Sequence, residues 1–180
     1  MPNRLRASSL AGGESRCIAN SFTEIEMPPV KIASADSLKD SIGREIAVSN
    51  WIVVTQERIN EFAQATGDRQ WIHLDRERAA KESPYGTTIA HGFLTLSLLS
   101  LLMQNALRFE KTGRHAINYG LNRVRFPSAV RAGSRIRGRF ALVAFKDLGD
   151  AVELVLSVTV ECEGSDKPAC IAEWVVRHYQ

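Results

Sequence analysis

Cysteine is scarce in this chain, and its scarcity limits what can cross-link the fold. The 180 residues contain 3 cysteines, which lie far apart at Cys17, Cys162 and Cys170. The number is odd and no pair has a C-x-x-C spacing, so the sequence predicts neither a disulfide framework nor a zinc site. A chain of this kind is typical of a reducing compartment, and we expect it in the cytoplasm.

A strong excess of one charge and a long apolar run are missing as well. The formal net charge is only +3, which gives no case for a nucleic-acid partner. Residues 1–30 contain no apolar segment of the kind that a secretory signal needs. The uncharged run Ile89–Leu107 has an apolar centre, Phe93–Met103, that is too short to cross a hydrocarbon core about 30 Å thick. We therefore expect no membrane partner and interpret the run as a helix buried inside a domain.

Length and composition predict one globular domain behind an N-terminal extension. Hydrophobic residues make up 44% and charged residues 24% of the chain, values that are ordinary for a protein with a packed core. Residues 1–34 are poor in aromatics and contain Gly12-Gly13 and Pro28-Pro29, so we interpret them as a flexible extension and place the domain at 35–180. The sequence leaves open whether Met27 is the true start.

Periodicity and breaker residues predict helices in the first half of the domain and strands in the second. Thr55 is a good N-cap for a helix over Gln56–Ala65, and Gly67 allows the left-handed turn that ends it. Irregular chain is expected over 68–74. Other expected helices are Ser37–Ile42, a short one from the N-cap Asp75 to about Lys81, and a long apolar one over Gly92–Phe109. The expected strands are Ile46–Val54, Ala116–Phe126, Arg135–Phe145, Val152–Cys162 and Ala169–Arg177.

The order of these elements predicts the architecture. One buried helix followed by an antiparallel meander indicates an α+β fold, with a curved sheet wrapped around its central helix. The segment 152–162 has the clearest strand pattern, because apolar residues occupy every second position along it.

Two short segments hold the residue types that acid–base chemistry needs. Asp68 and His73 stand five residues apart, just after the glycine that ends the first helix. Gly92 stands at the head of the long apolar helix, where backbone N–H groups are free to bind an oxygen. A carboxylate, an imidazole and such an N–H site are the parts that add or remove water beside a carbonyl group. Taken alone, Asp68 could equally be an Asx-turn residue, and we expect His91 to orient the loop.

The pattern Gly67-Asp68-x-x-x-x-His73 followed by Ala90-His91-Gly92 resembles the MaoC-type dehydratases, the (R)-specific enoyl-CoA hydratases, over roughly residues 36–178. The form Thr-Gly-Asp-x-Gln-Trp-Ile-His is closest to the branch that includes nodulation protein N. The resemblance implies a hot-dog fold, a homodimer, and hydration of a trans-2-enoyl thioester or the reverse dehydration, as in fatty acid metabolism. It also implies a substrate carried by coenzyme A or acyl carrier protein. No cofactor is expected, and one Asp and one His without a third ligand fall short of a metal site.

The resemblance also assigns roles to residues. Asp68 and His73 would hold and activate the water, and the Gly92 N–H would bind the thioester carbonyl. Ser100 matches a serine of the family eight residues beyond that glycine, where it would give polar support within the site. Many members have Asn-Pro where this chain has Gln70-Trp71. Gln70 can donate and accept hydrogen bonds as Asn does, whereas Trp71 removes a rigid proline and leaves the acyl-chain specificity open.

Two other functions compete with a hydratase. Hot-dog thioesterases commonly carry a carboxylate on the central helix, and Gly92–Phe109 contains none. A non-catalytic acyl-thioester binder would have no need of both Asp68 and His73. A set of arginines is interpreted as a solvated sheet face or, alternatively, as a contact for the phosphates of coenzyme A. The set is Arg123, Arg125, Arg131, Arg135, Arg137 and Arg139. Chain length, carrier and direction of reaction stay open.

Overall fold

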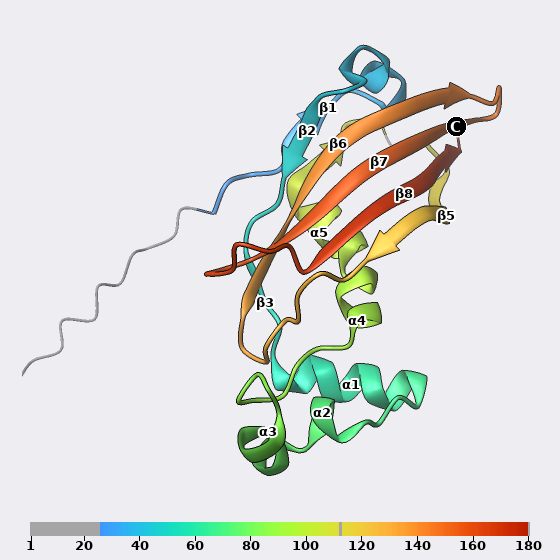
Figure 1. The fold of residues 1–180 in the computed structure, drawn as a ribbon. Coiled ribbons are helices and arrows are strands. Elements are labelled where there is room, and N and C mark those ends of the chain that lie inside the picture. Colours follow the sequence, from blue (N-terminus) through green and yellow to red (C-terminus); the bar gives the residue numbers. More distant parts are fainter. Residues whose placement is uncertain (1–25, 112, 180) are drawn as a thin grey trace, which may run out of the picture.

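A curved antiparallel sheet dominates the computed structural model, which describes residues 26–111 and 113–179. The sheet wraps around a helix, and three short helices gather beyond one end of it (Figure 1). This is the α+β, hot-dog arrangement that the sequence predicts. The strands of the main sheet are β2 (Glu45–Val48), β3 (Ile52–Val53), β5 (His115–Arg125), β6 (Arg135–Asp147), β7 (Ala151–Cys162) and β8 (Cys170–Tyr179).

Strand order departs from a simple meander. The sheet runs β2-β6-β7-β8-β5, and β3 also pairs with β6. Only β6, β7 and β8 follow one another as neighbours, because the connection over 126–134 carries the chain from the β5 edge back to β6. The predicted meander is therefore wrong for β5, which lies at a sheet edge beside β8.

The central helix is shorter than the sequence predicts. It consists of α4 (Gly92–Ser97) and α5 (Leu99–Ala106), joined at Leu98. Beyond it the backbone becomes extended, and β4 (Leu107–Phe109) pairs in parallel with β1 (Val30–Ile32). The helix prediction is thus wrong over 107–109, where pairing with β1 overrides helix propensity. The predicted flexible extension is wrong for β1 too, while residues 1–25 lie outside the described part.

Close packing of α5 against the sheet makes the core. Leu102 and Phe140 are fully buried, and Gly138 of β6 lies between them. A Cβ at Gly138 would stand 2.8 Å from the Phe140 ring and 3.2 Å from Leu102 Cβ. On β7 every second residue from Val152 to Val160 is buried, which confirms the predicted alternation. The missing side chain at Gly138 therefore permits the close approach of helix and sheet.

The predicted strand Ile46–Val54 is interrupted. The chain leaves β2 after Val48, and Ser49 accepts a hydrogen bond from the Gly138 N–H at 2.9 Å through its hydroxyl. This side-chain bond replaces a backbone bond between the two strands. Strand pairing with β6 resumes only at Ile52, where β3 begins. Upstream, the short helix expected at 37–42 is a 3-10 helix, η1 (Ala35–Ser41).

The helices beyond the end of the sheet are α1 (Gln56–Thr66), α2 (Trp71–Leu74) and α3 (Arg76–Glu82). The predicted caps are confirmed for α1 and α3: the Thr55 hydroxyl accepts from the Arg58 N–H, and the Asp75 carboxylate accepts from the Arg78 N–H at 2.9 Å. The prediction of irregular chain over 68–74 is wrong from Trp71 onward, where α2 makes one helical turn. Among the described residues, no helix is long and apolar enough to cross a membrane.

Candidate active site

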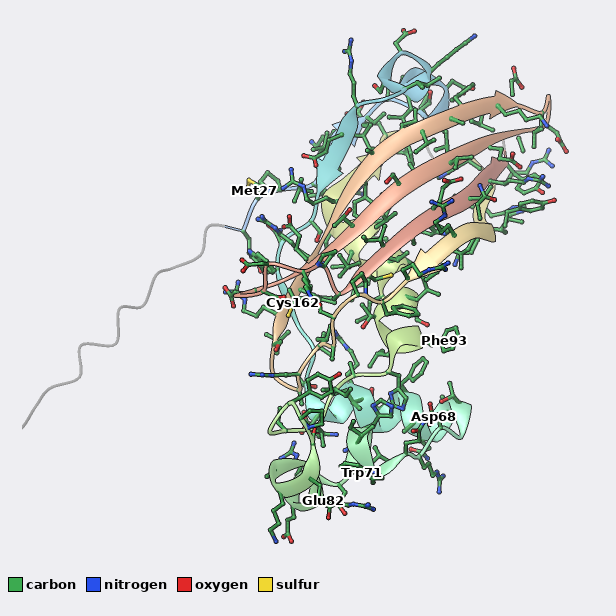
Figure 2. All side chains as sticks on the ribbon, viewed as in Figure 1. Met27, Asp68, Trp71, Glu82, Phe93 and Cys162 are labelled. Atoms are coloured by element: carbon green, nitrogen blue, oxygen red, sulfur yellow. The ribbon has the colours of Figure 1, made fainter. Side chains whose placement is uncertain are left out.

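The end of α1 positions Asp68. Gly67 adopts the left-handed conformation, with φ 79°, and its N–H donates to the Ala63 carbonyl at 2.9 Å. A residue with a Cβ would be strained there. The helix therefore stops cleanly, and the next residue, Asp68, lies half-buried at the end of the molecule where α1 and α2 meet α4 (Figure 2).

The single turn of α2 places the His73 side chain inside the protein. The imidazole is only 8% exposed, and its Nδ1 lies 2.7 Å from the Ile89 carbonyl oxygen. A carbonyl oxygen only accepts hydrogen bonds, so Nδ1 carries the proton. In the neutral ring the lone pair is then on Nε2, which makes His73 a base.

Burial also keeps His73 uncharged. Loss of hydration lowers the pKa of His73, and the nearby His91 lowers it further, whereas the bond to Ile89 and the Asp68 carboxylate raise it. The net direction is downward, so at neutral pH the imidazole is neutral and able to take a proton.

A buried polar network holds the backbone of His73, and the sequence analysis missed it. The Gln56 amide, 6% exposed, donates to the His73 carbonyl at 2.8 Å. The Thr88 hydroxyl, 1% exposed, donates to the other end of the same amide at 2.5 Å. The network joins the first turn of α1, the end of α2 and the segment before α4. In the sequence, only the glutamine at N1 of an amphipathic helix could have indicated this network.

His91 and Gly92 bring the start of α4 against this pair. His91 Nε2 lies 3.0 Å from the Asp68 carbonyl oxygen, and the His91 ring stacks on His73 with centroids 3.7 Å apart. Gly92 is the first residue of α4, so its N–H has no acceptor within the helix. A Cβ at Gly92 would meet the Phe126 ring at 3.0 Å, which leaves little room for a side chain.

His73 and Gly92 line one cavity of about 840 Å³. Its wall continues along the 126–134 connection and the turn between β7 and β8, with Arg131 and Lys167 among the lining residues. The Asp68, His73 and His91 side chains each bring one potential ligand atom within 4.8 Å of the others. The cavity is thus lined by the predicted imidazole and by the glycine that carries the predicted N–H donor, and the Asp68 carboxylate lies within 4.8 Å of the His73 ring nitrogen.

Two predicted site residues lie apart from that cavity. Ser100 is on α5 and lines a smaller, mostly apolar cavity of about 230 Å³ with Trp174. Gln70 has an exposed side chain, and its carbonyl accepts from the His73 N–H at 3.0 Å. Trp71, half-buried, packs under the Arg78 guanidinium at 4.3 Å. The contacts of Gln70 are thus those of a backbone support for α2.

The arginines of β6 are engaged with carboxylates. Arg137 Nε lies 2.6 Å from Glu161, and its guanidinium packs over the Trp51 ring at 4.6 Å. The other pairs on this face are Arg135–Glu163, Arg139–Glu45 and Arg139–Glu161. This arrangement favours an ion-paired sheet face over a free phosphate site.

The described residues contain one group whose potential ligand atoms lie close enough together to hold a metal ion. It consists of Asp68, His73 and His91. A metal ion bound by imidazole lies about 2 Å from the nitrogen, near the ring plane. The two imidazoles are stacked, with 28° between their planes, so both cannot direct a nitrogen in plane at one ion. This arrangement does not fit a shared metal.

Known proteins carry the same domain. A family model described as a MaoC-like domain matches residues 37–163. 3-Hydroxyacyl-thioester dehydratase Z of Mycobacterium tuberculosis (strain ATCC 25618 / H37Rv) is 53% identical over 146 residues, or 81% of this chain and 95% of that protein. Nodulation protein N of Rhizobium leguminosarum bv. viciae is 49% identical over 135 residues, or 74% of this chain and 84% of that protein.

A solved structure has the same fold as this chain. The (R)-hydratase from A. caviae involved in PHA biosynthesis has a TM-score of 0.57 at 21% identity, over 75% of this chain and 94% of that one. At this identity the likeness bears on the fold alone, whereas the family model and the two relatives bear on the chain itself. The chain therefore belongs to the MaoC-like dehydratase family, and it is a hydro-lyase.

Proposed function

We propose that the protein catalyses the (R)-specific hydration of a trans-2-enoyl thioester to the 3-hydroxyacyl thioester, or the reverse dehydration. One observation carries the proposal: a buried, neutral His73 with a free Nε2 lies beside the Asp68 carboxylate, in the cavity that Gly92 lines. This set supplies a base, a second water-binding group and an N–H donor without any cofactor.

The proposed reaction moves one water. The Asp68 carboxylate orients the water, and His73 Nε2 takes one of its protons as the oxygen attacks C3. Electron density moves to the thioester oxygen, where the Gly92 N–H stabilises the developing charge. The protonated pair then returns a proton to C2, so the product gains one H and one OH. Dehydration follows the same steps in reverse.

The cavity suggests where the carrier would lie. Its wall extends from His73 and Gly92 to Arg131 and Lys167, and cationic side chains suit the phosphate of either coenzyme A or acyl carrier protein. We propose an acyl thioester of this class as substrate. We also propose a reducing, cytoplasmic location, because the described cysteines, Cys162 and Cys170, are both free.

We further propose a homodimer. The β5 strand lies at an edge of the main sheet, and it exposes Ile117, Tyr119 and Leu121 by 40%, 54% and 43%. Pairing with the same edge of a second copy would cover both the open backbone and these side chains. Sedimentation at micromolar concentration tests this, and a species of only one chain mass would refute it.

The test of the proposed activity is the loss of enoyl-thioester absorbance with crotonyl-, octenoyl- and dodecenoyl-CoA. We expect turnover on at least one chain length, with the (R)-3-hydroxyacyl product on chiral analysis. Free thiol release in the same assay would indicate a thioesterase instead. Tight binding of enoyl-CoA without turnover on any chain length would leave only the acyl-thioester-binding alternative.

A further inference from the structure

His91 has a combination of contacts that simple packing does not explain. The side chain is 3% exposed, and it lies directly before α4. Its Nε2 faces the Asp68 carbonyl, so Nε2 carries a proton and donates it at 3.0 Å. Its Nδ1 is buried without a hydrogen-bond partner. An unpaired buried nitrogen is costly, and an apolar side chain would fill this space without that cost.

The ring of His91 also supports the ring of His73. The two imidazoles stack at 3.7 Å with 28° between their planes, and Phe62 of α1 packs on His91 at 5.0 Å and 50°. The His91 ring therefore contacts both the Phe62 ring and the His73 ring. This arrangement limits rotation of the His73 ring while its Nδ1 stays bonded to the Ile89 carbonyl.

We propose that His91 is a positioning residue of the reaction: its Nε2–H holds the Asp68 backbone, and its ring face holds the His73 imidazole beside it. One residue thereby couples the two groups that orient and deprotonate the water. The proposal rests on the proposed hydratase function, because positioning concerns that pair. The unpaired Nδ1 is the energetic cost of placing an aromatic ring and an N–H donor at the same position.

Electrostatics adds a second effect of the same residue. The ionisable groups that influence the pKa of His73 are His91, which lowers it, and Asp68, which raises it. From α1 the neutral amide of Gln56 contacts the His73 carbonyl, and Tyr85, from the loop after α3, lines the same cavity. His91 therefore acts in the same direction as burial, which is the larger effect, and both lower the pKa of His73.

Two substitutions separate the functions of His91. His91→Phe keeps a ring against His73 and removes the donor to Asp68. His91→Gln places an amide N–H near the position of Nε2 and removes the ring that stacks on His73. Phe62→Leu is the matched control, since it alters the packing on His91 but keeps the hydrogen bond.

We expect kcat of His91→Phe to fall about 10- to 100-fold with KM nearly unchanged, because Asp68 loses its tether. His91→Gln should recover part of that loss, and Phe62→Leu should stay within about threefold of wild type. In His91→Gln the pKa of His73, followed by NMR of its ring Cε1–H, should rise because the repulsive neighbour is gone.

Either of two results would overturn the proposal: a folded His91→Phe with wild-type kcat, or a folded His91→Gln that is no more active than His91→Phe. If His91→Phe does not fold, a folded His91→Gln with wild-type kcat still overturns the proposal, because the ring that stacks on His73 would then be dispensable. Absence of wild-type turnover on every enoyl-CoA would instead refute the proposed function. In that case a His73 ring NMR signal that is the same in wild type and in His91→Gln would still refute the positioning role of His91.

Discussion

The sheet with α5 and the helical end with α1–α3 are held together in different ways. In the sheet, regular alternation buries apolar side chains such as Leu156 and Val158 against Leu102, all at most 1% exposed. At the helical end, His73, His91, Gln56 and Thr88 are buried polar residues that bond to backbone and to one another. Buried apolar area and close packing stabilise the first region. In the second region, hydrogen bonds fix the positions of the candidate catalytic groups.

This difference predicts that substitutions at the helical end lower the activity of the protein while its fold is kept. Asp68→Asn and His73→Gln are near-isosteric, so each should cut kcat by about 10²–10⁴ while the melting temperature changes little. The double variant should be little worse than the worse single variant, since the two residues act as one unit. Steady-state kinetics and thermal melts on the same samples test this. Two folded single variants above about a third of wild-type activity would refute the assignment.

Two glycines allow a matched comparison between the regions. Gly92→Val should lower kcat by about 10²–10³ through the N–H donor, with a moderate loss of stability from the clash with Phe126. Gly138→Val should instead destabilise by about 1–3 kcal/mol or more, because its Cβ has no room beside Phe140 and Leu102. Urea unfolding and turnover, measured for both, separate the effects. A Gly92 variant with full activity would place the oxyanion site elsewhere.

Gln56 should affect both stability and rate. Gln56→Met leaves the Thr88 hydroxyl and the His73 carbonyl without their partner, at a cost of about 1–3 kcal/mol. We also expect slower turnover, since the turn that carries His73 loses its anchor. Asn60→Ala is the control, because it removes only the bond of the exposed Asn60 to the same amide. Unchanged melting and kcat in Gln56→Met would mean that the network is incidental.

The smallest effect is expected on the arginine face. Arg139→Met breaks half-exposed pairs with Glu45 and Glu161, which should cost about 1 kcal/mol or less. The KM for enoyl-CoA should not change, because this face is ion-paired within the protein. A KM that rises about tenfold, or about 1.4 kcal/mol, would support the alternative that these arginines bind coenzyme A.

The sequence predicted the two regions unequally. The period-two pattern placed β7, and capping residues placed α1 and α3 to within one residue, because these signals are local. The position of β5 beside β8 and the pairing of β4 with β1 depend on contacts distant in sequence. No local pattern encodes such contacts. The sequence analysis therefore placed β5 wrongly in the meander and extended the long helix wrongly over 107–109.

The candidate site shows the same limit. Asp68, His73 and Gly92 could be predicted because their spacing matches a family motif. Gln56 and Thr88 could not, since each is an ordinary polar residue until the fold buries it. Ser100 also matched by spacing, yet eight residues of helix at about 1.5 Å each carry it well away from Gly92. Spacing thus predicts candidate reacting groups, and the fold decides which neighbours support them.

The central claim is that a neutral His73 takes the proton from water, and the pH dependence of kcat/KM tests it most directly. Burial lowers the pKa of His73 from its ordinary 6.5, so wild-type activity should rise through an acidic limb below that pH and level off at neutral pH. In His73→Gln the residual activity should lack this limb. The same limb persisting unchanged in a folded His73→Gln would contradict the account, because another group would then be the base.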